Sequence, residues 1–136
     1  MFNRLKQFFQ GGKTMMYRQG DVLLIKVDGP FEVDPTRIRQ VEFDAGRVVL
    51  AYGEVTGHAH AIKVREVADA GDPAKPPVPS ARQFDYGAER FLRLVEKSVL
   101  EHEEHSPIEL DAGLYRVVRQ REYDPEEARR ARFVAD

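Results

Sequence analysis

The sequence has no cysteine among its 136 residues. Disulfide bonds, thiolate metal ligands and cysteine nucleophiles are therefore excluded, and a bound metal would need nitrogen and oxygen ligands. The chain also has no apolar run that approaches the roughly 18 residues of a membrane span. We accordingly expect no membrane span, and the absence of cysteine agrees with a cytoplasmic location.

Neither sign of charge dominates, because 21 Lys and Arg stand against 23 Asp and Glu, for a formal net charge of -2. This balance predicts no general attraction to nucleic acid or to anionic membranes. Arginines and tyrosines near the end of the chain could form a local nucleic-acid surface: Arg116, Arg119, Arg121, Tyr115 and Tyr123. Neighbouring acids neutralise these arginines, so we expect no nucleic-acid binding.

Residues 1–14 are predicted to form a short amphipathic helical extension. Apolar residues recur there at helical spacing and two glycines end the pattern: Phe2, Leu5, Phe8, Phe9, Gly11 and Gly12. A helix this short is marginally stable alone. It would dock on its own domain or bind a protein partner or a second copy. The alternative is that it lies upstream of the native start, which Met15 and Met16 leave open.

The remaining length fits one domain, and its pattern is mainly β. Seven segments separated by turn residues are predicted strands: 21–27, 37–43, 46–52, 58–64, 90–100, 107–110 and 114–123. Segment 90–100 also fits a helix, but its β-branched and aromatic content favours a strand. Four prolines between residues 67 and 81 predict a flexible internal loop, with a lid as the alternative. We expect residues 15–123 to form a small antiparallel β-sandwich or barrel of the jelly-roll type.

Residues 124–136 are predicted to form a C-terminal helix. Asp124 is a suitable cap, Pro125 suits the first helical position, and Glu126 and Glu127 face the positive end of the helix dipole.

The four histidines fall into two close pairs, His58/His60 and His102/His105. Residues two apart on a strand share a face, with Cα atoms roughly 6.6 Å apart, so the first pair can reach one metal. The second pair shares a face only if the acidic segment turns, and the nearby Pro107 favours a turn. A single shared site therefore depends on that turn.

Acidic residues beside the second pair would complete a site for Zn, Fe, Mn or Ni. Glu101, Glu103 and Glu104 offer oxygen ligands or a general base. An equally open alternative is that these histidines are solvated, salt-linked or structural.

Two resemblances accompany these residues. The His58-Ala59-His60 motif after a glycine turn is similar to the first metal motif of cupins, which implies His58 and His60 as ligands in a jelly roll. The next acid, Glu66, lies one position beyond the usual cupin spacing. Three longer segments resemble a family of small, uncharacterised bacterial proteins: YRQGDVLL (17–24), GEVTGHAHAI (53–62) and HEEHSPIELDAGLYRVVRQREY (102–123).

Two hypotheses of function follow. The first is an interaction or accessory module that also carries a histidine-based metal site. The alternative is a metal-dependent hydrolase or cupin-like oxygenase, with His58, His60 and His105 as ligands and His102 as the alternative ligand. In that enzyme Glu104 would be a ligand or the base that activates water.

Overall fold

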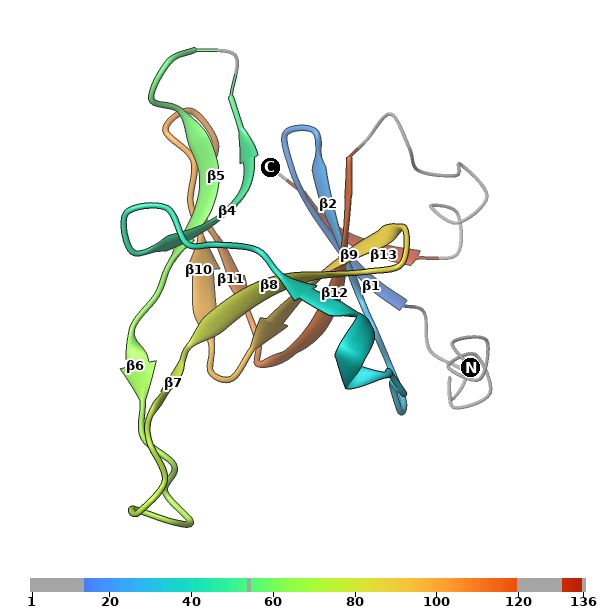
Figure 1. Ribbon diagram of the computed structural model, residues 1–136. Coiled ribbons are helices and arrows are strands. Elements are labelled where there is room, and N and C mark those ends of the chain that lie inside the picture. Colours follow the sequence, from blue (N-terminus) through green and yellow to red (C-terminus); the bar gives the residue numbers. More distant parts are fainter. Residues whose placement is uncertain (1–13, 54, 120–130, 136) are drawn as a thin grey trace.

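A seven-stranded sheet forms the larger part of the computed structural model, which describes residues 14–53, 55–119 and 131–135. The strands lie in the order β13-β1-β2-β12-β9-β8-β3 (Figure 1). Neighbouring strands are antiparallel except β13, which runs parallel to β1. The strands are β1 (Thr14–Gln19), β2 (Val22–Lys26), β3 (Ile38–Gln40), β8 (Ala81–Tyr86), β9 (Glu89–Leu94), β12 (Gly113–Arg119) and β13 (Ala131–Ala135).

Three strand pairs accompany this sheet: β4 (Arg47–Tyr52) with β5 (Ala59–Lys63), β10 (Ser98–Leu100) with β11 (Ile108–Leu110), and β6 (Glu66–Val67) with β7 (Val78–Pro79). An isolated bridge joins two of these pairs, since Ala61 and Glu101 exchange both backbone hydrogen bonds at 2.9 Å. β4, β5, β10 and β11 accordingly lie side by side (Figure 1). The bridge fixes the start of the loop after β10 against β5.

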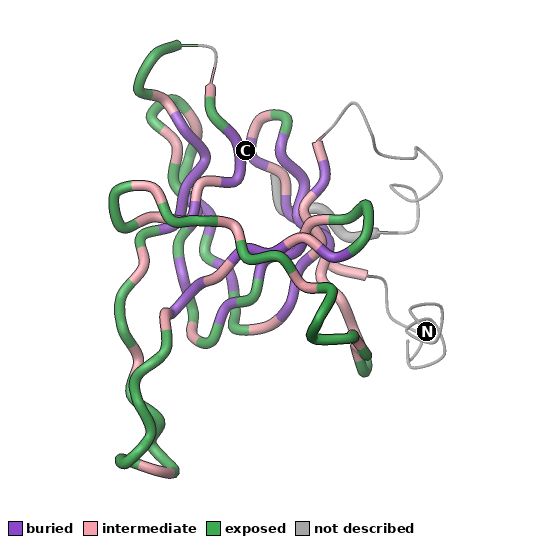
Figure 2. The backbone as a smooth tube through the Cα atoms, viewed as in Figure 1, coloured by how far each residue is buried: buried purple, intermediate pink, exposed green. Residues whose placement is uncertain are grey.

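The main core lies between the large sheet and these smaller pairs (Figure 2). Tyr115 on β12, Leu92 on β9 and Leu24 on β2 are fully buried in it, together with Ile62 on β5 and Leu100 on β10. Burying one such aliphatic side chain contributes about 1.5–3 kcal/mol relative to exposing it. These contacts hold the β5–β10 junction against the large sheet.

The antiparallel β architecture was predicted, and it is confirmed in its coarse form. The large sheet is open, however, and within the described residues no closed barrel forms. Of the predicted strands, 21–27, 46–52, 58–64 and 107–110 correspond to β2, β4, β5 and β11. The predicted strand 114–123 corresponds to β12 as far as Arg119, and residues 120–123 lie outside the described residues. The ambiguous segment 90–100 contains no helix and contributes to two strands, β9 and β10, with a bend at residues 95–96 between them. Of segment 37–43, only Ile38–Gln40 is a strand.

The prediction of a strand at residues 21–27 is explained by the burial of β2 on both faces. Leu24 faces the main core and Leu23 faces a second cluster with Met16 and Val118. Because both faces of the strand are buried, its sequence is a continuous apolar run.

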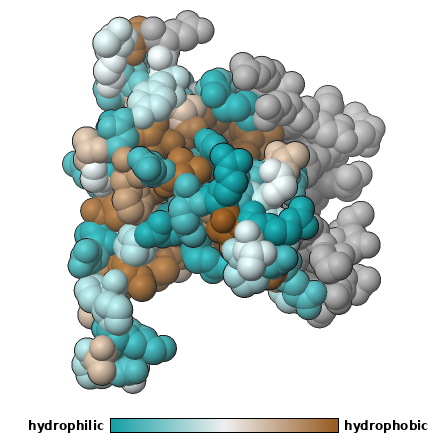
Figure 3. All heavy atoms as spheres, viewed as in Figure 1, coloured by the Kyte–Doolittle hydropathy of each residue, from teal (hydrophilic) through white to brown (hydrophobic). Residues whose placement is uncertain are grey.

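The proline-rich segment 67–81 was expected to be a flexible loop, but its ends are paired. Glu66 pairs with Pro79 and Val67 with Val78, so the segment is a β-hairpin that projects from the body. Figure 3 shows that this projection is largely hydrophilic, whereas hydrophobic residues gather on the body above it. The hairpin therefore adds little to the core.

The prediction of a C-terminal helix is wrong for residues 131–135, which the structure describes. Residues 131–135 form β13, whose Phe133 and Val134 pair in register with Met16 and Tyr17 of β1. Backbone pairing at a sheet edge outweighs the helix-start signal at Asp124, and Phe and Val favour strands. Residues 124–130 lie outside the described residues.

The predicted N-terminal helix over residues 1–14 also lies outside the described residues, except for Thr14, which begins β1. Among the described segments, the one helix is a 3₁₀ turn, Pro35–Arg37. No helix in this part of the chain is long and apolar enough to cross a membrane.

Candidate functional site

The structure brings the two histidine pairs together. His58 and His60 lie at the start of β5, and His102 and His105 lie in the loop between β10 and β11. The ring centroids are 4.3 Å apart for His60 and His102, 4.7 Å for His102 and His105, and 5.7 Å for His58 and His102. The acidic segment does turn before Pro107, and the Ala61–Glu101 bridge places this turn over β5.

Two glycines make room for the rings. Gly20 has φ +59°, and a Cβ atom there would lie 2.9 Å from Nε2 of His105 and 3.0 Å from Cε1 of His60. A Cβ atom at Gly53 would lie 3.0 Å from Cβ of His58 and 3.5 Å from Nε2 of His102. The imidazoles therefore pack directly against backbone at these two glycines.

A buried glutamine orients His60. Gln19, at the end of β1, donates through Nε2 to the carbonyl oxygens of Leu100 and Ser106, both at 3.0 Å. Its Oε1 must then accept a hydrogen bond, and it lies 2.9 Å from Nδ1 of His60. His60 consequently carries its proton on Nδ1. The network ties β1, β5 and the histidine loop together.

His60 is neutral in the folded protein near neutral pH. Burial lowers the pKa of His60 to about 4, with the charge of His102 as the next cause. Its Nε2 lies 3.7 Å from Oδ1 of Asp21. Asp21 in turn accepts two hydrogen bonds from Arg119, which is the main reason that the pKa of this carboxyl is lowered. The Nδ1 bond to Gln19 and the burial of the ring fit a positioning role.

Three other side chains lie close enough together to be candidate metal ligands. One ligand atom each from His58, His102 and Glu103 lies within 4.8 Å of the other two. The carboxylate of Glu103 also accepts a 2.9 Å hydrogen bond from the backbone N–H of Ala59, which lowers the pKa of Glu103. This carboxylate is therefore ionised and held beside the first residue of β5.

Two contacts bear on the roles predicted for His102 and Glu104 in this loop. The backbone N–H of Glu104 donates to Nδ1 of His102 at 3.0 Å, which occupies the lone pair of that nitrogen. The side chain of Glu104 is exposed, and its Oε2 lies 3.6 Å from Nδ1 of His58. Glu104 thus lies within the cluster, but Glu103 is the carboxylate that groups with two histidines as a candidate ligand.

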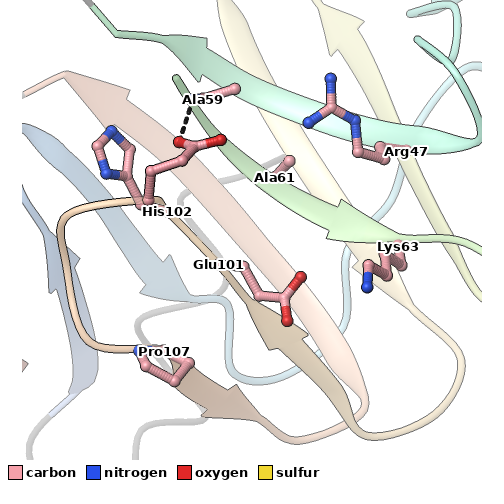
Figure 4. Close-up of a pocket in the computed structure, with 8 residues that line it drawn as sticks. Arg47, Ala59, Ala61, Lys63, Glu101, His102 and Pro107 are labelled. Atoms are coloured by element: carbon pink, nitrogen blue, oxygen red, sulfur yellow. Dashed lines mark hydrogen bonds between the residues drawn. The ribbon is translucent and has the colours of Figure 1, made fainter. Parts of the chain in front are cut away.

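An open pocket of about 400 Å³ adjoins this cluster (Figure 4). His102 lines one end, and Arg47 and Lys63 line the opposite side. Glu103 also lines the pocket, with its carboxylate bonded to the N–H of Ala59. The remaining lining residues are Ala59, Ala61, Glu101 and Pro107. The pocket therefore connects the candidate metal ligands with two cationic side chains.

Fold and site define a mainly β domain with a histidine and carboxylate cluster beside an open pocket. A family model described as "Domain of unknown function (DUF8820)" matches residues 18–120, and the chain belongs to this family. No curated protein and no solved structure matches the chain. The resemblance to cupins remains an interpretation of the short motif at His58 and His60.

The sequence pattern did not reveal the supporting residues Gln19, Gly20 and Asp21. All three belong to the segment 17–24 that carried the longer family resemblance. These residues lie about 40 residues or more from the histidines in the sequence, so local patterns do not show the contact between them. The contact forms because β1 pairs with β2 and the end of β1 then meets β5.

Proposed function

We propose that this domain binds a divalent metal ion through His58, His102 and Glu103. The observation that carries the proposal is the approach of their ligand atoms to within 4.8 Å of one another. Ligand atoms at about 2.1 Å from a tetrahedral ion lie roughly 3.4 Å apart. The side chains must therefore close by about an ångström, and two of them are in a surface loop.

The donor set limits the choice of metal. Two imidazoles and one carboxylate with open coordination positions are typical of catalytic Zn²⁺ and of non-haem Fe²⁺. Mn²⁺ and Ni²⁺ remain alternatives. Binding must break the hydrogen bond from Glu104 N–H to Nδ1 of His102. A neutral imidazole that binds a metal through one nitrogen carries its proton on the other, so Nδ1 is then either metal-bound or protonated. Losing that bond costs about 0.5–1.5 kcal/mol, whereas a micromolar metal site supplies about 8 kcal/mol.

The test is zinc titration of chelator-treated protein by calorimetry, followed by elemental analysis. We expect one ion per chain and a loss of affinity of at least about 100-fold in H58A, H102A and E103Q. The matched controls are E104Q and H105A, which remove neighbouring groups of the same chemistry and should retain the ion. Circular dichroism checks that each variant is folded.

Two results would overturn this ligand set. Wild-type protein that binds less than one ion per chain contradicts the site itself. Loss of the ion in H105A, with retention in H102A, would move the site to the set first suggested by the sequence, His58, His60 and His105.

A metal-dependent enzyme is the second candidate, favoured by the pocket that opens beside His102 and Glu103. Three protein ligands leave coordination positions for water, which a bound metal activates as a nucleophile. Water-proton relaxation of the Mn²⁺-loaded protein tests this candidate. At least one rapidly exchanging water is expected, and a site without such water contradicts a hydrolytic role.

An interaction or accessory module remains our proposal for the biological role, and metal binding is compatible with it. The apolar stripe on which that proposal rests belongs to residues 1–14. Light scattering of the full chain and of its F8E variant tests the role. If the stripe holds a second copy of the chain, the full chain is a dimer and F8E is a monomer. A monomer in both samples argues against self-association through the stripe.

A further inference from the structure

We propose that the pocket beside the histidine cluster binds a small elongated organic anion. Its carboxylate or phosphate group would lie between Arg47 and Lys63, and a second oxygen-bearing group would reach the metal end. This inference rests on the proposed function for the metal end, because His102 and Glu103 belong both to the pocket and to the metal site. The cationic end does not depend on the metal.

The cationic end is unusual for a sheet. Arg47 on β4 and Lys63 on β5 are direct cross-strand partners. Like charges in this position are destabilising. Among the described residues, no ion pair within 4.0 Å involves either side chain. Nε of Arg47 donates a 3.4 Å hydrogen bond to the carbonyl oxygen of Asp44. An anion between the two cations would remove the repulsion, and the arginine fork suits a carboxylate or phosphate.

The floor of the pocket consists of small residues. Successive residues of β5 point to opposite faces, so Ala59, Ala61 and Lys63 share the pocket face while His60 and Ile62 are buried on the other. Alanine is depleted in strands, and a larger residue at either position would fill the space. The two alanines therefore keep the path between the two ends open.

The dimensions indicate an elongated ligand. Ala59 and Lys63 are four residues apart on β5, or about 13 Å of strand. The long side chains at the metal end and at the cationic end extend into the pocket and shorten this distance. A single inorganic anion would still contact only one of the two ends. The volume of about 400 Å³ lies within the range of roughly 300–1,000 Å³ for small-molecule sites.

Glu101 restricts the middle of the ligand. Its side chain lines the pocket and points toward the Lys63 side (Figure 4). This carboxylate would repel a negative group close to Lys63, so the anionic group lies nearer to Arg47, and the part of the ligand beside Glu101 is neutral or carries an amine. The ligand class is thus an oxyanion-terminated chain with no central negative charge.

Glutarate is a suitable probe, because it has two terminal carboxylates and a neutral middle. Amide shifts are followed by NMR during titration of zinc-loaded and metal-free protein with glutarate and with butyrate. We expect shifts at Ala59, Ala61 and Lys63, and tighter binding of glutarate than of butyrate when zinc is present. In the R47Q/K63Q double variant we expect about tenfold weaker binding, with zinc affinity unchanged.

The matched control is K75Q/R93Q, which removes the same charge from exposed residues outside the pocket and should bind glutarate as the wild type does. Two results would overturn the proposal. One is that R47Q/K63Q binds glutarate as tightly as the wild type does, and the other is that glutarate causes no amide shifts in the zinc-loaded wild-type protein. If the chain binds no zinc, the proposed function fails separately. The metal-free titration then decides the pocket: glutarate binding sensitive to R47Q/K63Q supports it, and absence of binding overturns it.

Discussion

The buried amide of Gln19 should be a main organiser of the histidine loop. Its side chain is fully buried and contacts three partners: the carbonyl oxygens of Leu100 and Ser106 and Nδ1 of His60. Gln19→Leu keeps much of the volume and removes all three hydrogen bonds. The carbonyl of Leu100 and the ring of His60 are then left in the protein interior without this partner.

The expected cost follows from these contacts. Each buried polar group that loses its partner costs about 1–3 kcal/mol. Ser106 is exposed, so water can replace the bond to its carbonyl oxygen. Two buried groups give about 2–6 kcal/mol, and burial of the added apolar surface of leucine offsets roughly 1 kcal/mol. We expect a net loss of about 1–5 kcal/mol, which is a substantial part of the 5–15 kcal/mol typical of a domain.

Urea denaturation followed by circular dichroism measures this change. With a slope of about 2 kcal/mol per molar urea, the middle of the usual range, the midpoint should fall by roughly 0.5–2.5 M. Gln40→Leu is the matched control, because Gln40 is exposed on β3 and should change stability by no more than about 0.5 kcal/mol. A loss in Gln19→Leu no larger than in Gln40→Leu would refute the organising role of the network.

Three further predictions concern the same fold. Gly20→Ala and Gly87→Ala share a positive φ, but only the new Cβ at Gly20 meets imidazole atoms. Both should lose about 1 kcal/mol from backbone strain, and a urea titration should show an additional loss for Gly20→Ala; equal losses would contradict the close packing. The hydrogen bonds from Arg90 lower the pKa of Asp85. Their stabilisation is complete above the unfolded pKa of about 3.9 and is lost as the pH falls through the folded pKa. Asp85→Asn should therefore cost about 0.2–1 kcal/mol at pH 7 and nothing at strongly acidic pH, and a pH-independent difference would contradict this pair. Finally, zinc should shift the backbone amide resonance of Glu104, since its bond to the imidazole must change; an unshifted resonance in zinc-loaded protein would exclude His102 as a ligand.

The sequence by itself determined the β class and several strands. The apolar run of β2 and the β-branched run of β4 have few alternatives, because their residues favour extended backbone and must be buried. It also identified the four histidines as the chemically informative residues. Local composition is sufficient for such conclusions when the element is strongly patterned.

Other elements depended on partners distant in the chain. β8 contains the buried Gln83, whose polarity weakens the strand pattern, although its Nε2 donates to the carbonyl oxygen of Val49. β13 has a helix-start signal before it, yet residues 131–135 pair with β1. Local signals fail at these positions because long-range backbone pairing decides the conformation.

The arrangement of the site was likewise decided by tertiary structure. The spacing of His58 and His60 suggested that both side chains act together, but β5 directs His60 toward Gln19, while His58 lies near His102 and Glu103, the other two candidate ligands. The Ala61–Glu101 bridge brings the second pair to the first. Sequence spacing defines which residues share one strand face, whereas the partner of each ring is set by where distant strands pack.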